Sequence, residues 1–160
     1  MIKRLFFVFP GVDLTDFHPK TINPMQNRTM PDCTIIPVLA YPDVPQAIDW
    51  LCKVFGFTER WRAGTHRAQL SFEGGTITAA EANTANGEIP VSSLTVRVSD
   101  MDAHLRRTTE HGAEIIQQPI DYPYGERQYV VRDIGGHIWN FSQFISDVAP
   151  EDWGGISGVL

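Results

Sequence analysis

Polar and apolar residues alternate and then switch to a helical spacing twice along this chain. Residues 93–98 show the two-residue period of a half-buried strand. The alternation places two sets on opposite faces: Ser93, Thr95 and Arg97 against Leu94, Val96 and Val98. An earlier strand is predicted over residues 34–41, where Pro37 requires a sheet edge or a bulge.

Each strand is followed by a predicted helix with its own start and stop signals. Asp43 is placed to cap the first helix, with Gln46 three residues later, and Gly56 is placed to end it. Asp100 and Gly112 occupy the same positions around the second helix. The recurrence of cap, apolar stripe and stop predicts an internal repeat.

Three further strands complete each half, and the second hairpin in each half contains a Gly-Gly pair. The pairs are Gly74-Gly75 and Gly135-Gly136, which are predicted to supply tight turns. The predicted strands are 58–63, 67–72 and 76–80, then 114–118, 128–131 and 137–141. The sequence therefore predicts an α+β fold of two modules, residues 33–82 and 91–144, in which a strand and a helix precede three strands.

Length and composition narrow this picture. A chain of 160 residues favours one domain, predicted here over residues 31–145 with a C-terminal tail at 146–160. A net charge of −6 argues against a partner nucleic acid, and no stretch approaches the roughly 20 apolar residues of a membrane span. Residues 1–30 are predicted to be an extension or arm rather than an export signal, with Met25 or Met30 as alternative starts. Cys33 and Cys52 are predicted to be buried free thiols in a cytoplasmic protein.

Four stretches in this order resemble the vicinal oxygen chelate superfamily, which includes glyoxalases, bleomycin-resistance proteins and dioxygenases. They are Tyr41-Pro-Asp-Val-Pro-Gln-Ala-Ile-Asp-Trp with Phe55-Gly-Phe, Val98-Ser-Asp-Met-Asp-Ala, Asp121-Tyr-Pro-Tyr-Gly-Glu-Arg-Gln-Tyr, and Arg132-Asp-Ile-Gly-Gly-His-Ile-Trp-Asn-Phe. Ile134 replaces the proline that is usual in the last motif. The tail Glu151-Asp-Trp-Gly-Gly is similar to that of bleomycin-resistance-like members. The resemblance implies paired βαβββ modules in an open, cupped eight-stranded sheet with helices outside, a ligand in the cup, and a homodimer.

The resemblance also implies where a divalent metal would bind in catalytic members. The corresponding positions here are Ile36, Ala79, Ser93 and Asn140, with Glu81 as a substitute for Ala79 two residues along the same face. Isoleucine and alanine side chains have no donor atom, and serine and asparagine are poor ligands for Ni, Zn, Fe or Mn. The sequence therefore predicts that the family's four-ligand metal site is missing.

Arg97 is the most informative candidate for ligand binding. Strand periodicity turns Ser93, Thr95 and Arg97 into the cup, and Asn140 and Ser142 with them. A guanidinium in a concave site needs Glu81, another acid or an anionic ligand as its partner, unless it lies on the rim. The further candidates are Trp61, which is placed to stack on a planar ligand, His66, and Tyr124 and Arg127, which border the cup with Tyr122.

The remaining histidines receive structural predictions. His137 is predicted to be a satisfied structural or surface residue, and His104 and His111 are predicted to face solvent from the second helix. These assignments leave a metal-free small-molecule binding protein, which sequesters or senses its ligand, as the leading hypothesis. The alternatives are a metal-dependent lyase, isomerase or dioxygenase with displaced ligands such as His66 and Glu81, and a degenerate dimerisation or regulatory module.

Overall fold

The computed structural model describes residues 29–83 and 88–158. The described residues from Pro31 onward belong to one compact unit. Most of the predicted arm, with Met25, lies outside the described residues, so its role stays a prediction. None of the described helices is both long enough and apolar enough to cross a membrane.

The first module contains a strand, a helix and three more strands, as its sequence predicts. Strand β1 pairs in parallel with β4 at one edge, and the sheet order is β1-β4-β3-β2. Helix α1 continues directly into the π-helix η2. The bounds are β1 Val38–Tyr41, α1 Val44–Trp50, η2 Leu51–Phe55, β2 Thr58–Ala63, β3 Arg67–Phe72 and β4 Gly75–Glu81.

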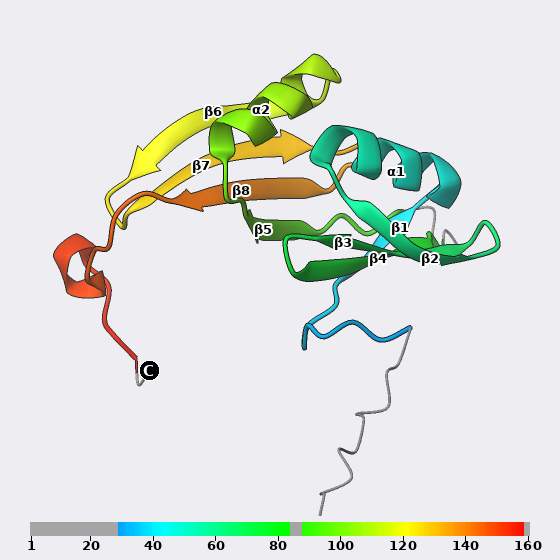
Figure 1. The fold of residues 1–160 in the computed structure, drawn as a ribbon, viewed down its shortest axis with the longest axis horizontal. Helices are drawn as coiled ribbons and strands as arrows, with labels where there is room; N and C mark the ends of the chain where they lie inside the picture. Colours follow the sequence, from blue (N-terminus) through cyan, green and yellow to red (C-terminus); the bar gives the residue numbers. More distant parts are fainter. Residues whose placement is uncertain (1–28, 84–87, 159–160) are drawn as a thin grey trace, which may run out of the picture. The chain divides into compact units, whose positions relative to one another are not determined.

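The second module repeats this order, which confirms the predicted α+β fold of two βαβββ modules. Its sheet order is β5-β8-β7-β6, again with a parallel pair at one edge. Helices α1 and α2 lie on the same side of the two sheets (Figure 1). The bounds are β5 Ser93–Arg97, α2 Met101–Glu110, β6 Glu114–Tyr122, β7 Glu126–Arg132 and β8 Ile138–Phe144, followed by the short 3-10 helix η3, Pro150–Trp153, in the tail.

Both helices begin where the sequence places their caps. The Asp43 carboxylate accepts a hydrogen bond from the Gln46 amide at 2.9 Å, and the Asp100 carboxylate accepts one from Ala103 at the same distance. These bonds satisfy amide groups that have no partner within the helix. The first helix ends at Gly56 in the left-handed conformation, with φ of 82°. The predicted starts and the predicted stop of the first helix are therefore confirmed.

The turn between β3 and β4 uses Glu73 and Gly74, not the predicted pair Gly74-Gly75. Both turn residues have positive φ, 40° for Glu73 and 86° for Gly74. A glutamate in this region is strained, because its Cβ crowds the backbone. Its carboxylate accepts hydrogen bonds from the Ser99 amide at 3.0 Å and the Ser99 hydroxyl at 2.9 Å. The hairpin of the first module is thereby tied to the segment between β5 and α2 of the second.

The two modules share one hydrophobic core on the helix side of their sheets. Phe55 at the end of η2 meets two rings of β8, with ring centroids 5.3 Å from Trp139 and 4.9 Å from Phe141. All three side chains are fully buried. Trp139 and Phe141 face the helices as the sequence predicts, because successive residues of a strand point to opposite faces.

A buried carboxylate in the turn between β7 and β8 also joins the modules. Asp133, which is 5% exposed, accepts hydrogen bonds from the Tyr41 hydroxyl at 2.7 Å and the Trp139 indole at 2.9 Å. It also accepts the backbone amides of Gly135 and His137, each at 2.9 Å. Burial and this neighbouring carboxylate hold the pKa of Tyr41 far above its ordinary value, so the phenol stays a donor. Tyr41 belongs to the first module and Asp133 to the second.

We expect Gly135→Ala to lower the free energy of unfolding by about 2 kcal/mol, because the new methyl group overpacks this junction. A Cβ at Gly135 would lie 2.6 Å from Cδ1 of the buried Tyr41 ring, which Asp133 holds in place. Gly158→Ala is the matched control, since a Cβ there meets nothing within 4 Å. Urea unfolding followed by circular dichroism measures both. Equal stability of the two variants would contradict the predicted clash.

Candidate functional site

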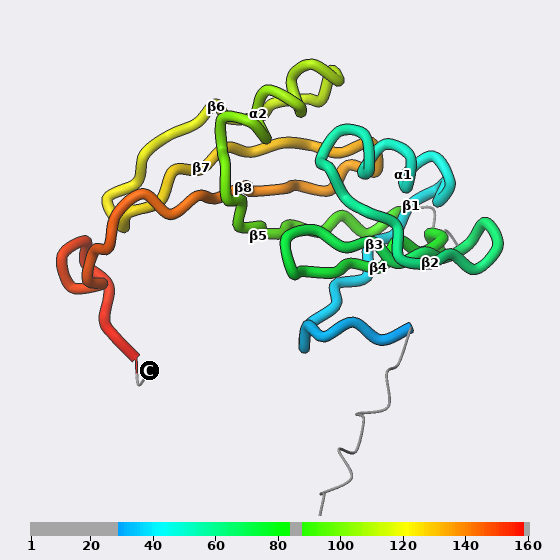
Figure 2. Tube along the Cα trace, viewed as in Figure 1, coloured from blue at the N-terminus to red at the C-terminus, as the bar shows by residue number. Residues whose placement is uncertain are grey.

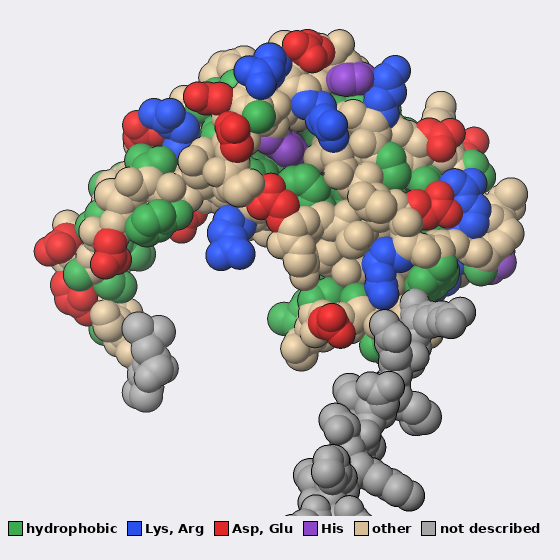
Figure 3. All heavy atoms as spheres, viewed as in Figure 1, with side chains coloured by type: hydrophobic (Ala, Val, Ile, Leu, Met, Phe, Trp, Pro, Cys, Tyr) green, Lys and Arg blue, Asp and Glu red, His purple; other side chains and the backbone are tan. Residues whose placement is uncertain are grey.

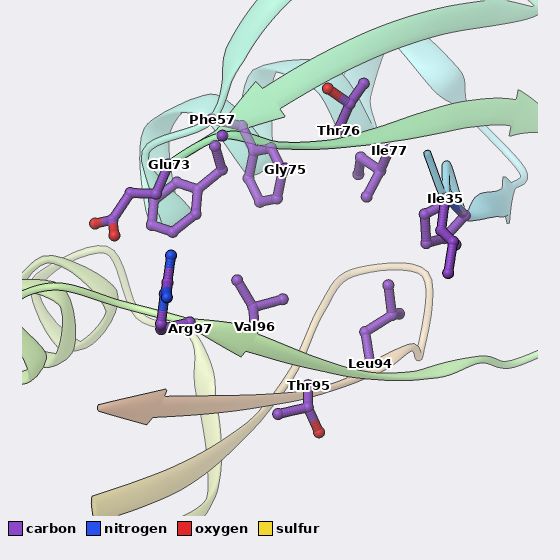
Figure 4. Close-up of a pocket in the computed structure, with 13 residues that line it drawn as sticks. Ile35, Phe57, Glu73, Gly75, Thr76, Ile77, Leu94, Thr95, Val96 and Arg97 are labelled. Atoms are coloured by element: carbon purple, nitrogen blue, oxygen red, sulfur yellow. The ribbon is translucent and has the colours of Figure 1, made fainter. Parts of the chain in front are cut away.

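A cleft lies between the β3–β4 hairpin of the first module and strand β5 of the second (Figure 4). The backbone path of these two segments can be followed in Figure 2. Its volume is about 590 Å³. Apolar side chains from both modules form its walls, among them Phe57, Ile77, Leu94 and Val96. Because its two walls come from separate modules, the cleft exists only when the modules pack together.

The orientation of β5 decides which of its residues reach the cleft. Leu94 and Val96 point into it, whereas Thr95 points to the opposite side of the strand (Figure 4). The sequence predicts Leu94, Val96 and Val98 on the helix face; Val98 is buried, but Leu94 and Val96 are only half-buried because they border this open space. Leu94 and Val96 thus form a wall of the cleft and also pack against the hydrophobic core.

One end of the cleft carries two charged side chains, Arg97 and Glu73. Arg97 rises from the end of β5 toward the hairpin (Figure 4), so it reaches the cleft rather than the face that Thr95 occupies. The ion pairs between described residues involve Arg62, Arg127 and Arg132. Arg97 therefore has no acidic partner within 4 Å in the described part of the chain. The predicted pairing with Glu81 does not form.

The face of the second sheet that lies away from the helices carries a directed chain of hydrogen bonds. Asn140 donates to Gln128 at 3.0 Å, and Gln128 donates to Glu126 at 2.8 Å. Ser142 also donates to Glu126. The direction follows from Glu126, because an ionised carboxylate only accepts. Asn140 and Ser142 share a face as predicted. Glu126 escapes sequence reasoning because the predicted strand begins only at residue 128, whereas β7 begins at Glu126.

This direction leaves an acceptor without a partner at the end of the chain. Asn140 Oδ1 is buried and accepts no hydrogen bond from the residues described. Gln128 cannot reverse to donate to it without leaving Glu126, since its amide already points its nitrogen at the carboxylate. The Asn140 amide thus has its nitrogen bonded to Gln128, and its oxygen is the atom left without a partner among the described residues.

The four positions inferred for a metal do not fit a metal site. Ala79 pairs with Leu39, as Trp139 pairs with Leu94, so Ala79 corresponds to the core residue Trp139 and not to Asn140. Its predicted place in the cup is wrong by one residue, and Glu81, two residues along the same face, fails for the same reason. Ile36 precedes β1 altogether. Within 29–83 and 88–158, no three His, Cys, Asp or Glu side chains are grouped as metal ligands would be.

Several other predicted site residues lie away from the cleft. His66 is in the exposed turn before β3, and Glu81 ends β4 directly across the ladder, where its amide donates to the His66 carbonyl at 2.8 Å. Trp61 is half-buried in β2, next to a break in the register. Ser93 starts β5 and is exposed, and it lies outside the lining of the cleft.

Tyr124 lies in the turn between β6 and β7 and Arg127 near the start of β7, and both are outside the lining of the cleft. The rings of Tyr122 and Tyr124 stack with centroids 5.0 Å apart, and Trp153 of the tail meets Tyr124 edge-on at 5.6 Å. Arg127 binds the Asp121 carboxylate through two bonds of 2.6 and 3.0 Å. Arg127 alternates with Glu126 and Gln128 along β7, so it lies on the other face of that strand. A ligand contact for these residues stays a prediction.

His104 is buried, which makes the prediction of solvent exposure wrong. Its Nε2 lies 3.1 Å from the Phe55 carbonyl, and its Nδ1 lies 2.5 Å from the Tyr129 hydroxyl. Because a carbonyl only accepts, Nε2 carries the proton and Nδ1 accepts from Tyr129. Burial lowers the pKa of His104 from 6.5 to about 4, so the ring is neutral at pH 7. The apolar positions of α2 alone did not reveal that η2 covers this residue.

His137 is a structural histidine, as predicted. It is fully buried, its Nε2 donates to the Ala40 carbonyl at 2.9 Å, and its Nδ1 accepts from the Ser92 amide at 3.0 Å. The two cysteines are free as predicted, but both are half-buried rather than buried. Neither histidine of the core has a ring nitrogen left to bind a ligand.

The surface shows no large area of one charge on the face in Figure 3. Acidic and basic side chains are interspersed across the described residues there. The expected absence of a nucleic-acid partner stays a prediction. The cleft and the chain of hydrogen bonds on the second sheet are therefore the two features with the chemistry of a binding site.

Comparison with known proteins shows which sequences and folds this chain is similar to. The solved structure of TioX from Micromonospora sp. ML1 is 38% identical and superposes with a TM-score of 0.64, covering 69% of this chain and 98% of that one. A glyoxalase/bleomycin resistance protein/dioxygenase from Nocardioides is 20% identical with a TM-score of 0.58, covering 82% of this chain and 91% of that one, and shows the same fold. An uncharacterized protein of Mycobacterium bovis is 28% identical over 132 residues, which are 72% of this chain and 86% of that one.

The family model named Glyoxalase/Bleomycin resistance protein/Dioxygenase superfamily matches residues 32–141. The match spans both βαβββ modules from before β1 into β8. It agrees with the four motifs and with the repeated topology of the two sheets. This chain therefore belongs to the Glyoxalase/Bleomycin resistance protein/Dioxygenase superfamily.

Proposed function

We propose that this protein binds a small organic molecule in the cleft between the β3–β4 hairpin and β5, and that it does so without a metal, to sequester or sense that molecule. The observation that carries this proposal is the cleft itself. Its volume of about 590 Å³ and its apolar walls with charged groups at one end match small-molecule sites in proteins.

The side chains at the four positions inferred for a metal support ligand binding without a metal. The positions that would hold a metal offer an alanine in the core, an isoleucine before β1, a serine and an asparagine. The alternative, a metal-dependent lyase, isomerase or dioxygenase, would rely on His66 and Glu81, which face each other through a backbone hydrogen bond, and the described residues group no third His, Cys, Asp or Glu with them. Metal analysis of the purified chain separates the two, since a stoichiometric transition metal would contradict the proposal.

Blocking the cleft is expected to abolish ligand binding. A panel of glycopeptide, phosphonate and aromatic compounds is screened by thermal shift, and the compounds that raise the melting temperature are then titrated. We expect Val96→Trp to weaken their binding at least about tenfold, because the indole fills the space into which Val96 points. Ile116→Trp, at an exposed position of β6, is the matched control.

Two results would overturn this function. Ligands that bind Val96→Trp and the original chain equally would place the site elsewhere. A chain that binds nothing in the panel would favour the third hypothesis, a dimerisation or regulatory module. The homodimer itself stays a proposal.

A further inference from the structure

We infer that the ligand of the cleft is an amphipathic anion, an elongated apolar molecule that ends in a carboxylate. This inference rests on the proposed function, and it names the class of ligand. It draws on the position of the unpaired guanidinium of Arg97 at one end of apolar walls.

Arg97 has unused capacity to bind an anion. Its guanidinium offers five N–H donors in a planar fork that matches a carboxylate. None of the ion pairs between described residues includes it, and it points into the space between β5 and the hairpin. Of the charged groups in the lining of the cleft, it is the single cation. A carboxylate at this end would form a charge-assisted hydrogen bond, which is stronger than a neutral one.

Glu73, the acid at the same end, does not cancel this preference. Its two carboxylate oxygens already accept the amide and hydroxyl of Ser99, at 3.0 and 2.9 Å. Those bonds direct the carboxylate toward the segment before α2 and away from the apolar walls (Figure 4). The Glu73 carboxylate is therefore already bonded on the side away from the apolar walls, whereas no acidic side chain among the described residues pairs with the Arg97 guanidinium.

The remaining walls select an apolar body. Phe57 and Ile77 from the first module face Leu94 and Val96 from the second across the cleft (Figure 4). An alkyl or aryl chain between them removes apolar surface from water on both sides, which is the main favourable term for such a ligand. A second charged group at the other end would have to lose water beside apolar walls that offer it no partner, which is unfavourable, so the inference is specific to a molecule with one charged end.

Three probes with the same chain and different head groups test the inference: octanoate, octanol and octyltrimethylammonium. Isothermal titration of the full chain at pH 7.5 measures affinity, and methyl NMR of Leu94, Val96 and Ile77 locates binding. We expect octanoate to bind about tenfold more tightly than octanol, the scale of one charge-assisted hydrogen bond. We expect Arg97→Gln to bring the two affinities together, and Arg97→Lys to retain part of the difference. Arg106→Gln, on the exposed side of α2, is the control that leaves the ratio unchanged.

The outcomes separate this inference from the proposed function. If octanol shifts the cleft methyl signals and binds as tightly as octanoate, the ligand is not selected as an anion, but the cleft still binds apolar molecules. Tighter binding of octyltrimethylammonium would show that Glu73 dominates and would overturn the inference. No methyl shift with any probe would overturn it as well, and the Val96→Trp comparison would then decide the proposed function by itself.

Discussion

Replacing Asp133 with alanine is expected to lower the free energy of unfolding by about 4 kcal/mol. The substitution removes the acceptor of the Tyr41 hydroxyl and the Trp139 indole, both in fully buried side chains. It also leaves the amides of Gly135 and His137 without their partner in the turn. A buried donor that loses its acceptor costs more than the hydrogen bond contributed, because water does not reach it.

The position of Asp133 makes this a test of how the modules are joined. Asp133→Asn keeps the shape of the side chain and one acceptor oxygen, but its NH₂ group would face one of the buried donors. We therefore expect about half of the loss in the free energy of unfolding that Asp133→Ala causes. Asp147→Ala, at an exposed position after β8, is the control for removing a negative charge. Urea unfolding followed by near- and far-ultraviolet circular dichroism is the measurement. A loss below about 1 kcal/mol for Asp133→Ala would show that Tyr41 and Trp139 find other partners.

Stability is expected to fall by about 3 kcal/mol between pH 6.5 and pH 4 because of His104 alone. Burial lowers the pKa of its ring from 6.5 to about 4 in the folded chain. Below pH 6.5 the unfolded chain binds a proton at this histidine and the folded chain does not, so the unfolded state is favoured as pH falls. Well above pH 6.5 the ring is neutral in both the folded and the unfolded chain. His104 then causes no loss of stability. Glu73 and Arg107 also act on the ring, in opposite directions, and both effects are smaller than that of burial.

The variant His104→Gln isolates this histidine from the other titrating groups. A glutamine is able to donate to the Phe55 carbonyl and accept from the Tyr129 hydroxyl, as the neutral ring does, but it does not ionise in this range. We expect the variant to be less stable at pH 7.5, because it fills less of the space among the surrounding rings, and to lose less stability on acidification. The difference between the two pH profiles of urea unfolding is the readout. Parallel profiles would mean that His104 titrates normally in the folded chain.

The elements of this fold are encoded locally, which explains why so many were predictable. Asp43 and Asp100 cap their helices with amides three residues away, an interaction that depends on neighbouring residues only. Strands β2 and β3 match their predicted bounds because their alternation and flanking turns lie within a few residues. The π-helix from Leu51 to Phe55 was not predicted, because the apolar residues in this segment have the spacing of an ordinary α-helix.

Errors arose where the assignment depended on contacts between modules. Ala79 was placed in the cup by counting along the strand, but its pairing with Leu39 puts it in the core. His104 was assigned to solvent because the spacing of α2 cannot show that η2 packs above it. Arg97 was predicted to point into a concave site on the same face as Thr95; it lines the cleft, but on the side of β5 that Val96 occupies.

By itself, the sequence determined the repeated strand, helix and three-strand order, both helix starts, the structural role of His137 and the superfamily. These depend on short-range spacing and on motifs that recur in fixed order. Only the tertiary structure decided that Phe57, Ile77, Leu94 and Val96 face one another across a cleft, and that Arg97 stands at its end without an acidic partner. The reason is physical: the walls of the cleft come from residues that are distant along the chain, and their approach is set by the shared core around Phe55 and Trp139.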